Sequence, residues 1–182
     1  MNLIILPGND WRNQVWTEEI EQLVKEDFEK TWVQHYDNWG THTLLLDPEM
    51  EMKNLAQKAQ DFGEFVIFAK SAGTLLAMKA VTEGKIKPVK CMFVGTAIRW
   101  GMTQGWPVEN WVKGYNLPTL FIQKTDDPIM RFADLKQELE KLEVKNYKLV
   151  EIPGDSHHYE KVFELKKMLK ELTVNKEYEG IG

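Results

Sequence analysis

The amino-acid sequence predicts an α/β fold, a three-layer α/β/α sandwich around a mostly parallel sheet of about six strands. Two observations indicate it. Short runs that are apolar along their whole length, such as 65–69, alternate with longer stretches whose apolar residues recur at helical spacing. Strands with no polar face are buried on both sides, as they are in parallel sheets covered by helices. In such a sheet the ligand site lies at the carboxyl ends of the strands.

The first strand is expected at 2–6, where Pro7 and Gly8 end the apolar run. The second is expected at 31–36, with 42–46 as the competing segment. The other strands are expected at 65–69, 89–94, 117–123 and 147–152, and the helices at 14–29, 50–61, 72–83, about 131–142 and about 159–172, with a short helix around Trp111. The polar tail 173–182 is expected to fray.

Length and composition predict one soluble domain spanning 1–182. The chain has 182 residues, of which 43% are hydrophobic and 28% charged. Its net charge of −5 argues against nucleic acid as a partner, because an acidic surface repels phosphates. No apolar run approaches the roughly 20 residues of a membrane helix. We therefore expect a small-molecule substrate, with no indication of a protein partner.

The N-terminus resembles a strand and a turn rather than a signal peptide. The single cysteine, Cys91, allows no intrachain disulfide, which fits a cytoplasmic location. The sequence shows neither metal-ligand spacing nor a glycine-rich phosphate loop, so no metal or cofactor is expected.

Ser71 stands between the apolar run 65–69 and an apolar helix that begins at Ala72. A nucleophilic serine on such a strand-to-helix turn needs small residues two positions before and two after it, usually glycines. Here Ala69 and Gly73 occupy these positions. The N–H of Ala72, at the helix N-terminus, is expected to donate to an oxyanion. The alternative is that Ser71 is an ordinary helix N-cap.

The base is expected at His157, because it follows the last predicted strand and precedes the last helix. His158 is the alternative, and both histidines could instead be solvent-facing residues at the helix start. The orienting acid should follow the strand 117–123, where two aspartates compete. We favour Asp127 over Asp126, because Pro128 holds Asp127 outside a helix and within the turn.

A second oxyanion donor is expected from the loop after the first strand. Gly8 allows the backbone to turn toward the serine, and the N–H of Asn9 is the expected donor. The same residues would also form a simple Pro-Gly turn.

The chain resembles the α/β-hydrolases, and among them the small cap-less serine hydrolases related to retinoblastoma-binding protein 9 and the YdeN-type proteins. The resemblance covers most of 2–172. It rests on Leu-Pro-Gly-Asn at 6–9, Tyr-Asp-Asn-Trp at 36–39, Ala-Lys-Ser-Ala-Gly at 69–73, Asp-Pro at 127–128 and Pro-Gly-Asp-Ser-His at 153–157. It implies Ser71 as nucleophile, Asp127 as acid and His157 as base, in a sheet that begins at the family's usual third strand. Ala69 and Lys70 depart from the family pattern, in which histidine often precedes the serine.

Trp100 and Trp106 lie in a connection of about 20 residues that is too short for a cap domain. One interpretation makes them an apolar wall for substrate, and the other makes them packing for the short helix. Lys70 could favour anionic substrates or be a solvated lysine at a helix start.

Three functions compete. The sequence favours a serine hydrolase acting on a small ester, thioester or amide. The alternative is a hydrolase-shaped interaction protein with little catalysis, supported by the departures at Ala69 and Lys70. A nucleotide-binding domain lacks support, because no glycine-rich turn follows the first strand.

Overall fold

Six strands form one parallel sheet in the order β2-β1-β3-β4-β5-β6. The computed structural model describes residues 1–41 and 43–174. The strands are β1 (Asn2–Leu6), β2 (Thr31–Val33), β3 (Phe65–Lys70), β4 (Lys90–Val94), β5 (Thr119–Lys124) and β6 (Tyr147–Ile152). The predicted fold class is confirmed, and each predicted strand is present with bounds that shift by a few residues.

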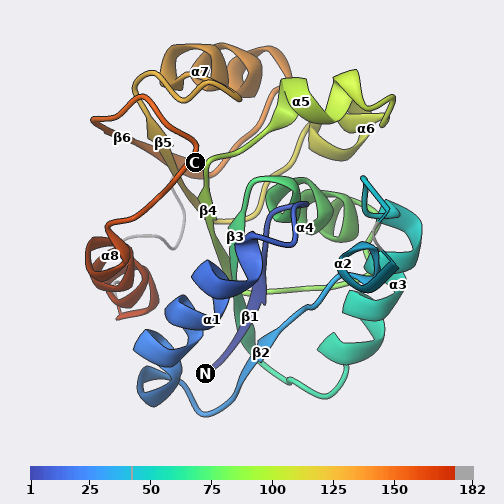
Figure 1. Cartoon of the computed structure of the whole chain (residues 1–182), viewed down its shortest axis with the longest axis vertical. Helices are drawn as coiled ribbons and strands as arrows, with labels where there is room; N and C mark the ends of the chain where they lie inside the picture. The colour runs from blue at the N-terminus through green and yellow to red at the C-terminus, as the bar shows by residue number, and fades with distance from the viewer. Residues whose placement is uncertain (42, 175–182) are drawn as a thin grey trace.

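Helices cover both faces of the sheet (Figure 1). One face packs against α1 (Asn13–Val24) and α8 (Val162–Val174). The other face packs against α3 (Pro48–Ala59), α4 (Ala72–Thr82), α5 (Ile98–Thr103), α6 (Val108–Val112) and α7 (Phe132–Lys141). The one-turn elements η1 (Lys25–Asp27) and α2 (Asp37–Thr41) complete the described chain.

The strand β3 is apolar along most of its length because it is buried on both faces of the sheet. All six of its residues are buried. Ile67 and Ala69 belong to the core under α4, whereas Val66 and Phe68 belong to the core under α1 and α8. Because side chains alternate along a strand, Lys70 continues the second set and points toward α1.

Several element boundaries differ from the predictions. The strand β2 ends at Val33 rather than 36, since the Tyr36 hydroxyl instead bonds the carbonyl of Pro7 at 3.0 Å. Residues 43–46 form no strand, and His42 lies outside the described residues. The helix α8 begins at Val162 rather than 159, and it includes Thr173 and Val174, which were expected to fray. The rest of that tail, 175–182, lies outside the described residues.

The connection between β4 and β5 contains only α5 and α6, so the structure has no cap domain over the sheet. Among the described residues, no helix combines the length and the apolar character needed to cross a membrane.

Candidate active site

Ser71 occupies a sharp turn between β3 and α4. Its backbone has φ 53° and ψ −121°, a conformation that residues other than glycine rarely adopt. The Ser71 N–H donates to the carbonyl of Val94 at 3.0 Å, which ties the turn to the neighbouring strand β4. Its side chain makes no capping bond to α4, so the N-cap interpretation does not describe it. Backbone strain of this kind persists only where the surroundings enforce it.

Gly73 shows what the surroundings require. A Cβ at this position would lie 2.5 Å from the carbonyl oxygens of both Leu6 and Pro7. The end of β1 therefore packs directly against the first turn of α4, and only glycine fits. Ala69, in the place of the first glycine, is fully buried with its methyl group in the core. The departure at Ala69 is thus accommodated without opening the turn.

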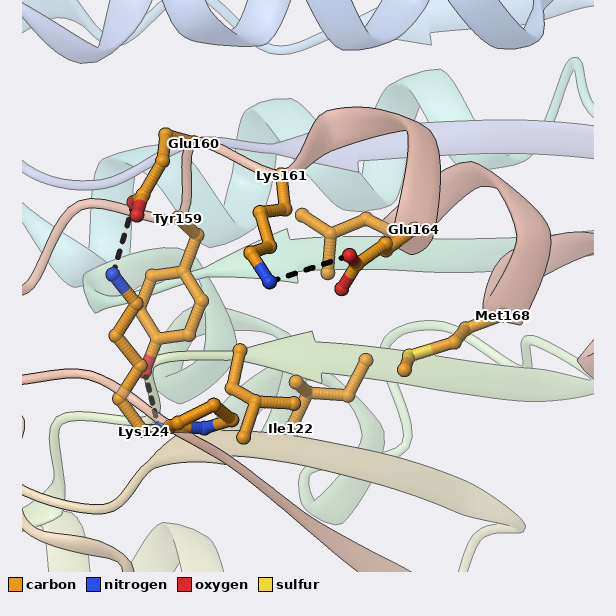
Figure 2. Close-up of a pocket in the computed structure, with 10 residues that line it drawn as sticks. Ile122, Lys124, Tyr159, Glu160, Lys161, Glu164 and Met168 are labelled. Carbon is orange, nitrogen blue, oxygen red and sulfur yellow. Dashed lines mark hydrogen bonds and ion pairs between the residues drawn. The ribbon is translucent and has the colours of Figure 1, made fainter.

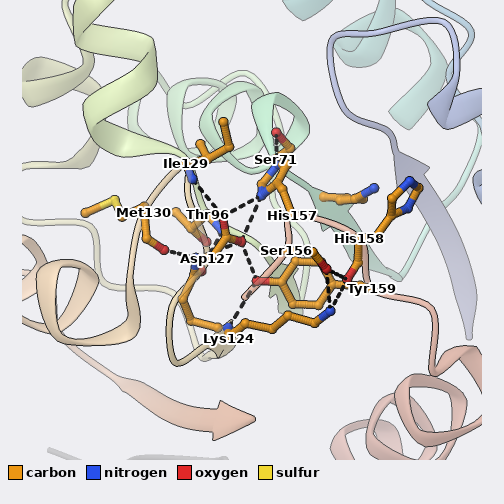
Figure 3. Close-up of polar contacts among 12 residues, drawn as sticks. Ser71, Thr96, Lys124, Asp127, Ile129, Met130, Ser156, His157, His158 and Tyr159 are labelled. Atoms are coloured by element: carbon orange, nitrogen blue, oxygen red, sulfur yellow. Dashed lines mark hydrogen bonds and ion pairs between the residues drawn. The ribbon is translucent and has the colours of Figure 1, made fainter. Parts of the chain in front are cut away.

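The structure brings Ser71, His157 and Asp127 together in one chain of contacts (Figure 3). Ser71 Oγ lies 2.9 Å from His157 Nε2. His157 Nδ1 lies 2.8 Å from Asp127 Oδ2 and 3.0 Å from Oδ1. Because an ionised carboxylate only accepts hydrogen bonds, Nδ1 carries the proton and Nε2 is left to accept from Ser71.

Asp127 is completely buried, yet it stays ionised. Burial would raise the pKa of its carboxyl group, but hydrogen bonds from His157, the Ile129 N–H and the Tyr159 hydroxyl bring that pKa below its usual value. The Ile129 N–H lies 2.9 Å from Oδ1, and the Tyr159 hydroxyl lies 2.8 Å from Oδ2. Both carboxylate oxygens are therefore fixed in orientation.

The two alternatives weighed from the sequence lie elsewhere. Asp126 and His158 are exposed, and the bonds that link Ser71, the imidazole and the carboxylate come from His157 and Asp127 instead. The carbonyl of His158 accepts from the buried ammonium of Lys124, so this residue serves the loop through its backbone.

Ala72 follows Ser71 in the chain, and Asn9 lines the same cleft as Ser71. Among the hydrogen bonds of the described residues, neither the Asn9 N–H nor the Ala72 N–H donates to another backbone group. The residues of the Tyr-Asp-Asn-Trp stretch hold Asn9 in place. Its carbonyl accepts from Asn38 Nδ2 at 3.1 Å and from Trp39 Nε1 at 3.0 Å. Its side chain bonds the backbone of Leu44 and Leu46.

An open cleft of about 660 Å³, solvent included, contains Ser71 and His157. Trp100 and Ile129 line it opposite the β1–α1 loop. Trp106 does not line the cleft; it packs edge-on against Trp100, with ring centroids 5.2 Å apart, and also against Trp111. Trp100 therefore lies on the cleft, as the first interpretation expects, whereas Trp106 packs behind it, as the second expects.

Lys70 is not a solvated lysine, because only 3% of it is exposed. It is the last residue of β3, and its direction toward α1 places its ammonium over the ring of Trp16. It lines a second hollow of about 640 Å³ that shares Asp10, Arg12, Asn13 and His157 with the serine cleft.

Sequence reasoning missed three kinds of supporting residue. Tyr159 bonds the acid, while Asn38 and Trp39 clamp Asn9. Gln123 joins two loops, because its Oε1 accepts from the Thr96 N–H at 2.9 Å while its Nε2 donates to the Met130 carbonyl at 2.5 Å. The conspicuous Tyr-Asp-Asn-Trp stretch was the available signal for the clamp, and no sequence pattern marked the other two.

A separate, small pocket of about 50 Å³ lies between α8 and the ends of β5 and β6 (Figure 2). Tyr159 and the ion pairs Lys124–Glu160 and Lys161–Glu164 border it. It contains neither Ser71 nor His157. Among residues 1–41 and 43–174, no group of three His, Cys, Asp or Glu side chains is placed to hold a metal.

No protein-family model matches the sequence, and no protein of curated function matches it either. Solved structures match over nearly the whole chain. The esterase Est1E from Butyrivibrio proteoclasticus, with ferulic acid bound, has a TM-score of 0.71 at 17% identity, covering 95% of this chain and 88% of its own. A protein described as a YdeN-like hydrolase from Pectobacterium atrosepticum has a TM-score of 0.64 at 18% identity, covering 94% and 90%. Mouse α/β-hydrolase domain-containing protein 10 has a TM-score of 0.71 at 15% identity, covering 94% and 89%. The expected resemblance is therefore confirmed at the level of architecture: the chain has the α/β-hydrolase fold.

Proposed function

We propose that this protein is a serine hydrolase that cleaves a small ester, thioester or amide through an acyl-enzyme. The observation that carries the proposal is the position of Ser71, on a strained turn with its Oγ 2.9 Å from an imidazole nitrogen. A serine hydroxyl is a weak nucleophile unless an adjacent base accepts its proton. The His157–Asp127 pair is such a base with its orienting partner.

In the proposed reaction, Ser71 Oγ bonds to the substrate carbonyl carbon and its proton passes to His157 Nε2. The carbonyl oxygen becomes an oxyanion and accepts from the N–H groups of Asn9 and Ala72. The intermediate then expels the alcohol, thiol or amine, which takes the proton from His157. Water, activated by the same imidazole, hydrolyses the acyl-enzyme and releases the acid.

The buried charge of Asp127 supports the proton transfer. As the imidazole becomes cationic, the carboxylate stabilises it at 2.8 Å without being protonated itself. The fold supports the same reaction class, because structural neighbours described as an esterase and as hydrolases share it. At 17% and 18% identity these neighbours support the fold, and the site residues must carry the chemistry.

A fluorophosphonate probe tests the proposal, because it reacts only with an activated serine. We expect the folded wild-type protein to be labelled and Ser71→Ala to remain unlabelled. Labelling rates should fall by roughly three to four orders of magnitude in His157→Ala and Asp127→Asn.

The chain offers a matched control for each partner. His158→Ala and Asp126→Asn change exposed neighbours of the same chemical type, and both should label at the wild-type rate. A wild-type protein that is folded by circular dichroism yet unlabelled would reject the enzyme and favour the hydrolase-shaped interaction protein. Equal losses in His157→Ala and His158→Ala would reject the assignment of the base.

A further inference from the structure

Lys70 differs from two other buried lysines of the described chain, Lys79 and Lys124, in its electrostatic surroundings. Lys79 forms ion pairs with Glu49 and Glu83, and Lys124 forms one with Glu160. Lys70 is buried to a similar degree, but no carboxylate of the described residues forms an ion pair with it. A buried ammonium without a counterion is costly, so the environment favours the arrival of an anion.

The local contacts satisfy only part of the ammonium. Its Nζ donates to Asn13 Oδ1 at 2.8 Å and lies 4.7 Å from the centroid of the Trp16 ring. Both partners are neutral, and the ammonium has three N–H donors. Burial, offset only partly by the more distant Asp127, lowers the pKa of Lys70 to about 8. The ammonium therefore retains donor capacity for a charged acceptor, which none of the described residues supplies.

The other charges around the hollow do not meet this need. Both oxygens of the Asp10 carboxylate accept from Arg12, at 2.9 and 2.7 Å, so this pair is neutral as a unit. The Asp127 carboxylate is occupied by His157, Ile129 and Tyr159. Lys70 is consequently the uncompensated charge of the hollow.

The hollow is continuous with the cleft that contains Ser71. The two share His157, whose Nε2 lies 2.9 Å from Ser71 Oγ, and the residues Asp10, Arg12 and Asn13. A molecule whose carbonyl carbon lies at Ser71 can thus extend past His157 into the hollow. It needs only the length of a small metabolite, because His157 borders both the cleft and the hollow.

We propose that this hollow is a carboxylate-binding subsite, in which the Lys70 ammonium donates a charge-assisted hydrogen bond to a carboxylate carried by the substrate. The inference rests on the proposed function, and it narrows the substrate class to small esters, thioesters or amides that bear a second, anionic group. Trp16 and Asn13 position the ammonium, and the neutral Arg12–Asp10 pair borders the entrance.

Two matched pairs of substrates test the subsite, one for each side of the scissile bond. The acyl-side pair is mono-4-nitrophenyl adipate and 4-nitrophenyl hexanoate, which have six-carbon acyl groups. The leaving-group pair is 4-carboxyphenyl butyrate and phenyl butyrate. The quantity measured is the ratio of kcat/KM for the carboxylated to the uncharged ester. Comparing this ratio between wild type and variant cancels differences in intrinsic reactivity.

In one of the two pairs, we expect Lys70→Met to lower this ratio by about tenfold or more, mainly through a higher KM for the carboxylated ester. Asn13→Asp provides a second variant that keeps Lys70. It places a carboxylate on the ammonium, so it should lower the ratio in the same pair by occupying the site. Lys70→Arg should retain part of the preference.

Binding without turnover separates this proposal from the proposed function. The ligand is adipate if the acyl-side pair shows the effect, and 4-hydroxybenzoate if the leaving-group pair does. This ligand should raise the Tm of Ser71→Ala but not that of Ser71→Ala combined with Lys70→Met. If both uncharged esters are hydrolysed and Ser71 is labelled, yet neither ratio changes in Lys70→Met, the subsite is rejected and the hydrolase stands. If labelling fails, the hydrolase is rejected. The same binding result then decides whether Lys70 holds a carboxylate.

Discussion

The hydroxyl of Tyr159 donates to Oδ2 of Asp127 at 2.8 Å, the same oxygen that lies 2.8 Å from His157 Nδ1. The Tyr159 oxygen in turn accepts from the backbone N–H of Lys124 at 3.2 Å. Trp16 Nε1 donates to the Tyr159 carbonyl at 2.8 Å and fixes its backbone. Asp127 is thus held by the side chain of Tyr159, two residues after His157.

Tyr159→Phe tests whether this contact positions the acid. Removing a hydrogen bond to a buried carboxylate leaves Asp127 less firmly oriented, so we expect kcat to fall by about tenfold with little change in KM. Steady-state kinetics on an activated ester measure both. Tyr115→Phe is the control, because it removes another buried tyrosine hydroxyl, 3.1 Å from Thr119 Oγ1, away from the site. A Tyr159→Phe protein with the kcat of Tyr115→Phe would contradict the positioning role.

Gly73→Ala tests the packing that shapes the serine turn. The new methyl group would lie 2.5 Å from two backbone oxygens that cannot rotate away, those of Leu6 and Pro7. We expect a loss of about 1–3 kcal/mol in the free energy of unfolding, and slower fluorophosphonate labelling as the Asn9 loop is displaced. Urea unfolding and labelling kinetics measure the two effects. Gly40→Ala is the control, since an added Cβ there meets no atom within 4 Å, and its stability should not fall.

The fold could be predicted because the strand sequences are apolar along their whole length, which indicates burial on both faces. A run such as Phe65 to Ala69 has no polar face, and only a covered parallel sheet accommodates it. Ends of elements were harder to predict. The segment after Val33 has the composition of a strand, but Tyr36 leaves the sheet to bond Pro7. Such a tertiary contact competes with strand propensity and has no local signature.

The Ser71–Asp127–His157 constellation could be placed from chain order, because loops that follow parallel strands converge at one edge of the sheet. Pro128 favoured Asp127 over Asp126, and it is Asp127 that lies 2.8 Å from His157 Nδ1. The supporting contact of Tyr159 could not be predicted, since it depends on the direction of a side chain about 30 residues away in sequence. Lys70 shows the same limit. Its burial follows from strand alternation and from Trp16 of α1, which the residues around Lys70 do not reveal.

Trp100→Ala tests the role of the apolar side of the cleft. Trp100 lines the cleft, so its removal should enlarge the space beside Ser71 and shift preference toward longer acyl chains, by roughly tenfold in relative kcat/KM. A series of 4-nitrophenyl esters from acetate to octanoate measures this. Trp106→Ala removes the ring behind it, which does not line the cleft, and should lower stability while leaving the preference unchanged. Identical chain-length profiles in wild type and Trp100→Ala would exclude Trp100 as a wall of the pocket.

Lys70→Met should change stability in a pH-dependent way. Burial lowers the pKa of Lys70 to about 8 in the folded state, whereas an unfolded lysine titrates near 10.4. Below pH 8 the ammonium is charged in both states, so folding carries the full cost of burying it. Between about pH 8 and 10.4 only the unfolded state holds the proton, and stability therefore rises with pH.

The variant lacks this titration, so it should exceed the wild type in stability at pH 7 by an amount of order 3 kcal/mol, less the lost contact with Asn13. The difference should shrink steadily as the pH rises from 8 to 10.4. Charged groups near Lys70, including Asp127, Lys124 and the Asp10–Arg12 pair, remain in both proteins, so the comparison isolates the one ammonium. Urea unfolding of both proteins at pH 7, 8, 9 and 10 measures it. A difference that stays constant across this range would mean that folding does not lower the pKa of Lys70.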